Sequence, residues 1–206
     1  MSKKLGIFLF FKGKYARLIY NDYKFLLMLH VNISHTEYDQ AIKALQDACP
    51  DLSHVELAID FSADHAQSKI VRDFVGKIFD YHNVKTPWWW RFTLITDELI
   101  NNAIEHWSSA WDIDSCLIES WRDPEGEFFI NLEVHDTGTG KYAKTAEEMA
   151  SVKENHKNDD PSGVYMEKRW RWLFHITEKL VDRLEFRESP KWGLAVRIEK
   201  AIPKNL

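Results

Sequence analysis

The order of predicted strands and helices after residue 53 is the feature that most restricts the fold of this chain. Alternating apolar residues predict a half-buried strand over 54–61, and apolar residues at helical spacing predict helices farther along. In chain order the predicted elements are a strand (54–61), a helix capped by Ser62, a helix (86–107), a hairpin (115–134), a polar loop (141–162), a helix (167–181) and a second hairpin (183–200). Strands outnumber crossover helices, so we expect a mixed sheet with the helices on one face, an α/β (α+β) two-layer sandwich.

The first 53 residues are predicted to form an N-terminal extension of unknown role. Two strands are expected over 6–11 and 15–20, followed by a helix over 37–48. Cys49-Pro50-Asp51 then interrupts the chain, which suggests a domain boundary. The expected division is therefore an extension over 1–53 and one domain over 54–206.

Charge and apolar runs exclude several classes of protein. The net charge is −5, without the basic excess that is typical of nucleic-acid binders, so no nucleic-acid partner is expected. The longest apolar runs fall far short of the roughly 20 residues that span a bilayer, so no membrane segment is expected. Two distant cysteines, Cys49 and Cys116, fit a reducing cytoplasm. Neither Cys49 nor His54 has the neighbours of a metal site.

Polar residues at i, i+4 and i+8 form a ridge on the predicted helix over 86–107. They are Glu98, Asn102 and His106. Most polar helix faces are only solvated, which is the simpler interpretation of this ridge. The alternative is chemical, because a carboxylate can accept a proton from a nucleophile and an amide oxygen can bind Mg²⁺.

A second pattern, D-x-G-x-G, follows the first predicted hairpin. It consists of Asp136, Gly138 and Gly140. The carboxylate can accept a hydrogen bond from an exocyclic amine, and glycine permits close approach of the backbone to a flat ligand. A turn between two strands would use the same residue types, so the position after the polar helix is what favours a binding site.

Together these two patterns resemble the GHKL ATPases, the superfamily of gyrase, heat-shock chaperones, histidine kinases and MutL. The likeness is greatest to the anti-sigma factor serine kinases of bacterial partner-switching systems. Glu98, Asn102 and His106 match the family's E-x-x-x-N-x-x-x-H motif, and Asp136, Gly138 and Gly140 match its D-x-G-x-G motif. The resemblance covers residues 54–200.

The resemblance implies an ATP- and Mg²⁺-dependent kinase that phosphorylates a serine of a STAS-type anti-anti-sigma protein. Glu98 would be the general base, and Asn102 would bind Mg²⁺ between the phosphates. Asp136 would bind the adenine amine, with the two glycines close to the ring, and His106 would approach the phosphates. A sigma factor as second partner and a homodimer are also implied.

Two departures from the family pattern leave an alternative open. The family's second glycine-rich box would fall at Arg171-Trp172-Leu173, where the chain has no glycine; Arg169 and Arg171 offer charged donors to phosphate instead. Gly193 is followed by Leu194 and Ala195, where the family usually has threonine. The alternative function is a catalytically degenerate GHKL domain that acts as a protein-binding regulatory module.

Tryptophan is abundant and confined to the second part of the chain. All 9 tryptophans lie after residue 87, while only 8 glycines occur in 206 residues. Trp88-Trp89-Trp90 is predicted to pack in the core or to form a protein-binding patch, because aromatic residues are enriched at interface centres.

Overall fold

In the computed structural model, residues 8–11, 14–21, 24–156, 179–190 and 193–204 are described. Within these residues, eight strands form a single mixed sheet in the order β1-β2-β3-β4-β5-β6-β8-β7. The strands are β1 (Phe8–Phe11), β2 (Lys14–Asn21), β3 (Lys24–Asn32), β4 (His54–Ser62), β5 (Ile113–Arg122), β6 (Phe128–His135), β7 (Arg183–Glu188) and β8 (Leu194–Ile202). Strands β3 and β4 pair in parallel and the other neighbours pair antiparallel.

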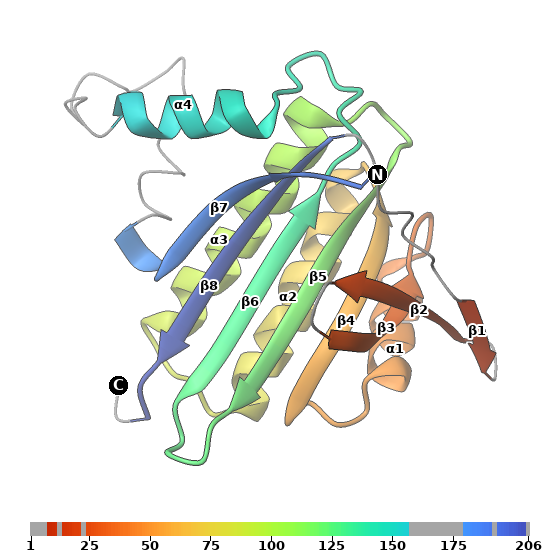
Figure 1. Ribbon diagram of the computed structural model, residues 1–206. Helices are drawn as coiled ribbons and strands as arrows, with labels where there is room; N and C mark the ends of the chain where they lie inside the picture. The colour runs from red at the N-terminus through yellow and green to blue at the C-terminus, as the bar shows by residue number, and fades with distance from the viewer. Residues whose placement is uncertain (1–7, 12–13, 22–23, 157–178, 191–192, 205–206) are drawn as a thin grey trace.

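Helices of the described part of the chain cover one face of this sheet (Figure 1). They are α1 (Tyr38–Ala48), α2 (His65–Tyr81) and α3 (Trp88–Asn102), and α3 continues into a π-helical turn, η1 (Ala103–Trp107). The predicted two-layer sandwich is confirmed. Its core lies between the layers, where Phe61, Phe74, Phe79, Phe92 and Phe128 are fully buried.

The predicted hairpins over 115–134 and 183–200 correspond to β5–β6 and β7–β8. The two predicted helix caps are shifted. Asp64, not Ser62, caps α2, because its Oδ1 accepts a hydrogen bond from the Ala66 N–H (3.0 Å). Pro87, not Thr86, is in the N-cap position of α3, since its carbonyl accepts from the Arg91 N–H (3.0 Å).

The N-terminal part of the chain extends the same sheet. The predicted strand pair is confirmed as β1–β2, and the predicted helix over 37–48 is α1. Strand β3 was not predicted; it pairs with β4 through residues 29–32. The Ile33 N–H also donates to the Asp60 carbonyl (2.8 Å), and Ile33 is fully buried. The division at residue 53 stays a prediction, but backbone bonds cross it.

The prediction of a polar loop over 141–162 is wrong for its central part. Residues 146–156 form helix α4 (Ala146–His156). Thr145 and Glu148 form a capping box: the Glu148 N–H donates to Thr145 Oγ1 (3.1 Å) and the Thr145 N–H donates to Glu148 Oε2 (2.8 Å). Met149 anchors the helix in the core, with 1% of its surface exposed. The prediction relied on apolar periodicity, which is weak in this helix. The start of the helix is instead marked by the capping box.

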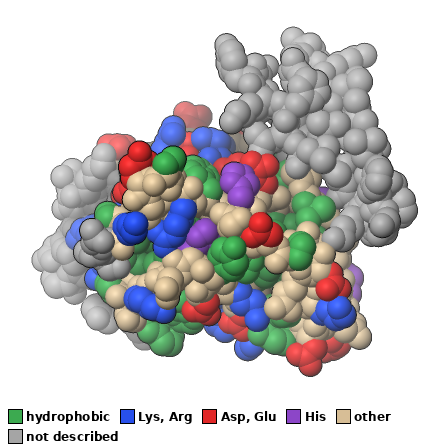
Figure 2. Space-filling view, turned by 90° about the horizontal axis from the view of Figure 1, so that it is seen from below, with side chains coloured by type: hydrophobic (Ala, Val, Ile, Leu, Met, Phe, Trp, Pro, Cys, Tyr) green, Lys and Arg blue, Asp and Glu red, His purple; other side chains and the backbone are tan. Residues whose placement is uncertain are grey.

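Within the described residues, the search for a membrane-crossing helix found none of sufficient length and apolarity. Figure 2 views the end of the molecule at the bottom of Figure 1. There, basic and acidic side chains are interspersed, with histidines between them. At the opposite end of the sheet lie the C-terminal end of β6 and the end of α3.

Candidate functional site

The end of α3 and the D-x-G-x-G segment are joined by backbone hydrogen bonds at the upper end of the sheet in Figure 1. In η1, the Ser108 N–H donates to the Ala103 carbonyl (2.9 Å), five residues back. Because the helix ends at Trp107, its last carbonyls have no partner within the helix. The Trp107 carbonyl accepts from the Gly140 N–H (2.9 Å), and the His106 carbonyl accepts from the Tyr142 N–H (3.1 Å). A π turn of this kind often marks a functional position in a helix.

Asp136 is the first residue of the 136–140 loop, and its side chain is buried. It follows β6 directly, and 1% of its surface is exposed. Its Oδ1 accepts from the Gly138 N–H (2.8 Å) and the Leu194 N–H (3.0 Å). Its Oδ2 is buried and has no hydrogen-bond partner among the described residues. One carboxylate oxygen is therefore fixed by backbone, and the other is a buried acceptor to which no described residue donates.

Burial dominates the electrostatics of this carboxylate. It raises the pKa of Asp136 to about 6, although the N–H donors from Leu194 and Gly138 act in the opposite direction. At neutral pH the group is still ionised. An ionised carboxylate accepts hydrogen bonds only, so the site calls for a ligand that brings a donor.

Gly193 packs directly against Asp136, at a position where there is no room for a side chain. A Cβ at position 193 would overlap Asp136 Oδ1, the Asp136 carbonyl oxygen and the Gly138 nitrogen. The Ser189 N–H donates to the Gly193 carbonyl (2.8 Å), which fixes the start of β8 against β7. The sequence did not predict this contact, because the two residues are far apart in the chain.

The ridge residues of α3 lie in different environments. Glu98 is half-buried, whereas Asn102 is 5% exposed and its Nδ2 has no hydrogen-bond partner among the described residues. His106 is in η1, where its ring lies 6.2 Å from that of Tyr142 in an edge-on arrangement. The structure therefore brings His106 next to the 136–140 loop and leaves a second orphaned polar group, that of Asn102, one turn before it.

Gly138 and Gly140 serve the shape of the 136–140 loop. Gly138 has φ +68°, a left-handed conformation that favours glycine. A Cβ on Gly140 would lie 2.6–2.8 Å from backbone atoms of His106, Trp107 and Ser108. Gly140 thus permits the loop to pack against the end of the helix.

Replacing Gly140 with Ala is expected to lower the free energy of unfolding by about 2 kcal/mol, because rigid backbone cannot yield to the added methyl group. Gly76→Ala in α2 is the matched control. Its Cβ would meet side chains rather than backbone, the Trp89 ring at 3.2 Å and Thr93 Cγ2 at 3.7 Å, and alanine favours the helix, so a change below about 1 kcal/mol is expected. Urea denaturation measures both. Equal losses in the two variants would contradict this account of Gly140.

Polar residues that follow η1 form hydrogen bonds with the 136–140 loop, and the sequence did not indicate them. The 108–112 loop follows η1, and its Asp112 accepts hydrogen bonds from Thr137 and Thr139. The buried Ser108 accepts from the Thr137 N–H (3.3 Å) and donates to Asp114 Oδ1 (2.6 Å). No motif marks these residues; the only available signal was a cluster of hydroxyl and carboxylate side chains on both sides of β5–β6.

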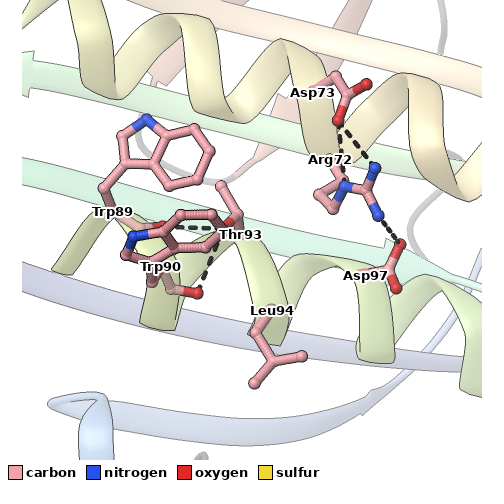
Figure 3. A pocket seen from close by; sticks show the side chains of 7 residues that line it. All are labelled: Arg72, Asp73, Trp89, Trp90, Thr93, Leu94 and Asp97. Carbon is pink, nitrogen blue, oxygen red and sulfur yellow. Dashed lines mark hydrogen bonds and ion pairs between the residues drawn. The ribbon is translucent and has the colours of Figure 1, made fainter. Parts of the chain in front are cut away.

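A separate cavity of about 360 Å³ lies between α2 and α3, on the side away from the sheet (Figure 3). Trp90 and Leu94 form an exposed apolar wall, 65% and 52% exposed. Arg72 lies between Asp73 and Asp97 and pairs with both. Trp88 and Trp89 pack against the core, and Trp89 also lines this cavity, so the predicted core packing is confirmed for these two residues and the protein-binding patch stays a prediction.

Cys49 and Cys116 are both free cysteines. Cys49 donates to the Asp51 carbonyl (3.4 Å), and burial raises the pKa of Cys116 to about 12, so its thiol stays protonated. In the described part of the chain, no three His, Cys, Asp or Glu side chains are arranged to hold a metal ion. Arg169 and the segment Arg171-Trp172-Leu173, expected to face the phosphates, lie outside the described residues.

Comparison with known proteins gives little further information. No protein-family profile matches the sequence, and no curated protein matches it either. Among solved structures, a chain of the SiaB–SiaC complex from Pseudomonas aeruginosa is similar with a TM-score of 0.44 and 8% sequence identity. The match covers 78% of this chain and 97% of that chain. This similarity is too low to transfer a residue role.

Proposed function

We propose that this protein is an ATP- and Mg²⁺-dependent serine kinase of the GHKL type that phosphorylates a STAS-type partner in a partner-switching system. One observation carries the proposal. Oδ2 of the buried carboxylate of Asp136 has no donor among the described residues, and Asp136 begins a loop that is bonded to the end of the helix bearing Glu98, Asn102 and His106. The E-x-x-x-N-x-x-x-H and D-x-G-x-G patterns supply the family resemblance.

Asp136 would hold the adenine base. An exocyclic amine would provide the donor that Asp136 Oδ2 lacks among the described residues. Satisfying a buried orphan acceptor is worth more than making one more bond at an exposed site, because the cost of its desolvation is already present. The same carboxylate would reject a base that presents a carbonyl at that position, since two acceptors would face each other.

Asn102 would hold the metal ion and Glu98 would move the proton. A half-turn of the Asn102 amide about its last torsion exchanges its nitrogen and oxygen, so the orphaned position can present an oxygen ligand. Bound Mg²⁺ would neutralise charge on the phosphates. Glu98, one turn earlier on α3, would accept the proton of the attacking serine hydroxyl. In such a reaction the protein mainly positions groups and stabilises charge.

The missing glycines at 171–173 favour the second candidate function, a degenerate domain that binds a protein partner without phosphate transfer. Backbone N–H groups at a helix start normally bind phosphate, and bulky side chains obstruct that approach. Incubation with Mg²⁺·ATP and a STAS-type partner, followed by intact-mass analysis, separates the two. A phosphoserine on the partner supports the kinase; its absence together with tight ATP-independent binding supports the module.

ATP affinity is expected to fall as the pH drops below about 6. The pKa of Asp136 is raised to about 6 by burial, so protonation at lower pH turns Oδ2 into a donor that opposes the adenine amine. The dissociation constant should rise roughly tenfold per pH unit below that value. Titrations of the wild-type protein between pH 5 and pH 8 measure this dependence. A flat profile in the wild type would contradict the assignment of Asp136.

A further inference from the structure

Asp112 holds both variable positions of the D-x-G-x-G segment with one carboxylate oxygen. Its Oδ2 accepts from Thr137 Oγ1 (2.6 Å) and from the hydroxyl of Thr139. The same oxygen accepts from the Ser109 N–H (2.9 Å), which ties Asp112 to its own turn. Three donors from two loops therefore converge on a single acceptor.

Further bonds lock the same two loops together. The Ser109 N–H also lies 3.0 Å from Thr139 Oγ1, and Ser109 Oγ donates to the Thr139 carbonyl (3.0 Å). The Asp112 N–H donates to the Ser109 carbonyl (3.1 Å), which closes the 108–112 turn. The 136–140 loop thus rests on a small rigid turn that continues directly from the end of α3.

The charge state of Asp112 fits this role. Burial acts to raise its pKa, but the hydrogen bonds from Thr137 and Thr139 and from the Ser109 N–H outweigh it, and the pKa lies below its usual value. The group is therefore an anion across the physiological range, and its hydrogen bonds are charge-assisted. Such bonds are suited to holding a loop in one conformation.

We infer that Asp112 is a positioning residue for ligand binding: it fixes the 136–140 loop in the conformation that turns Asp136 Oδ2 toward the ligand. This inference rests on the proposed function. The loop contains two glycines, and Gly138 is in a left-handed conformation, so the free chain would sample many alternatives. A loop ordered before binding does not lose that freedom on binding, which raises affinity.

The proposed test compares Asp112→Ala and Asp112→Asn with a matched control, Asp123→Ala. Asp123 also anchors a loop, since its Oδ1 accepts from the Glu127 N–H (2.7 Å), but it lies at the opposite end of β5 and β6. Calorimetry measures the dissociation constants of ATP and adenosine, thermal unfolding checks the fold, and hydrogen exchange reports on residues 136–142 without any ligand.

We expect Asp112→Ala to raise the dissociation constants of ATP and of adenosine by the same factor, about 10- to 30-fold, because the loop would contact the base that both ligands share. Asp112→Asn should lie between Asp112→Ala and the wild type, since an amide oxygen still accepts hydrogen bonds, and Asp123→Ala should leave affinity unchanged. Amide exchange in residues 136–142 should accelerate in Asp112→Ala. Folded Asp112→Ala that binds ATP as the wild type does, or unchanged exchange, would overturn the inference.

Failure of the proposed function gives a different result. If the wild type binds neither ATP nor adenosine, the proposed function is wrong, and exchange alone then decides whether Asp112 orders the loop. Faster exchange would support that ordering, and unchanged exchange would refute it.

Discussion

Replacing Asp136 with Asn is expected to reduce ATP affinity at least about 100-fold without lowering thermal stability. The amide places either a donor or a weaker acceptor where the adenine amine needs a carboxylate oxygen. Because Oδ1 already accepts from Gly138 and Leu194, the variant keeps its own oxygen at that position and turns its NH₂ group toward the ligand. Two donors then oppose each other in a buried site.

The stability of the Asn variant follows from the raised pKa. A carboxyl whose folded pKa lies above its unfolded value costs stability wherever it is ionised, so the cost is full above about pH 6 and is relieved as the pH falls toward 4. The difference between 3.8 and about 6 corresponds to about 3 kcal/mol. A neutral amide avoids this cost, although its buried NH₂ group offsets part of the gain. The melting temperature should be unchanged or higher.

Glu133→Gln is the matched control, because Glu133 lies on the same strand and its pKa is shifted the opposite way. Burial acts to raise this pKa, but contacts with His135 (3.0 Å) and Arg197 (3.2 Å) prevail and lower it to about 2. Its ionised form therefore stabilises the fold above about pH 4.5, and this stabilisation is lost as the pH falls through about 2. The Gln variant should lose stability and keep ATP affinity. A stability loss without an affinity loss in Asp136→Asn, together with an affinity loss in Glu133→Gln, would contradict a binding role for Asp136.

Replacing Glu98 with Gln is expected to slow phosphate transfer by about 10²- to 10⁴-fold, while the ATP dissociation constant changes less than about threefold. The amide keeps the size of the side chain but cannot take the serine proton. Single-turnover transfer to the STAS-type partner, followed by mass spectrometry, measures the rate, and calorimetry measures binding.

Asp97→Asn is the control for this variant, because Asp97 is the adjacent carboxylate of α3. It faces α2, where it pairs with Arg72 (3.4 Å) and accepts from Ser68 Oγ (3.3 Å). Its variant should transfer phosphate at nearly the wild-type rate in the folded fraction. Transfer that is equally slow in both variants, or unaffected in Glu98→Gln, would show that Glu98 is not the base.

Local patterns were sufficient for most of the fold. Strict alternation over 54–61 predicted β4, and apolar spacing predicted α2 and α3, because each element buries one face against the same core. Strand β3 was missed because its apolar residues form a continuous run without alternation, although it pairs with β2 in a hairpin and with β4 in parallel. Helix α4 was missed because the capping box of Thr145 and Glu148 was overlooked in a polar segment.

The candidate site was predictable where its chemistry is contained in a short motif. Asp136 and the glycines follow a strand, and Glu98, Asn102 and His106 share one helix, so spacing alone indicated both groups. Gly193 and Asp112 were not predictable in this way. Each acts through a contact with the 136–140 loop from a distant part of the chain, and only the folded arrangement shows which glycine or which aspartate makes that contact.

A calorimetric titration of the wild-type protein with ATP in the presence of Mg²⁺ at pH 7.5 is the decisive experiment for nucleotide binding at Asp136. We expect saturable binding with a dissociation constant on the order of micromolar, weakened at least about 100-fold in Asp136→Asn and retained in Glu133→Gln. Absence of binding to the folded wild type, or equal binding by the Asp136→Asn variant, would contradict nucleotide binding at Asp136.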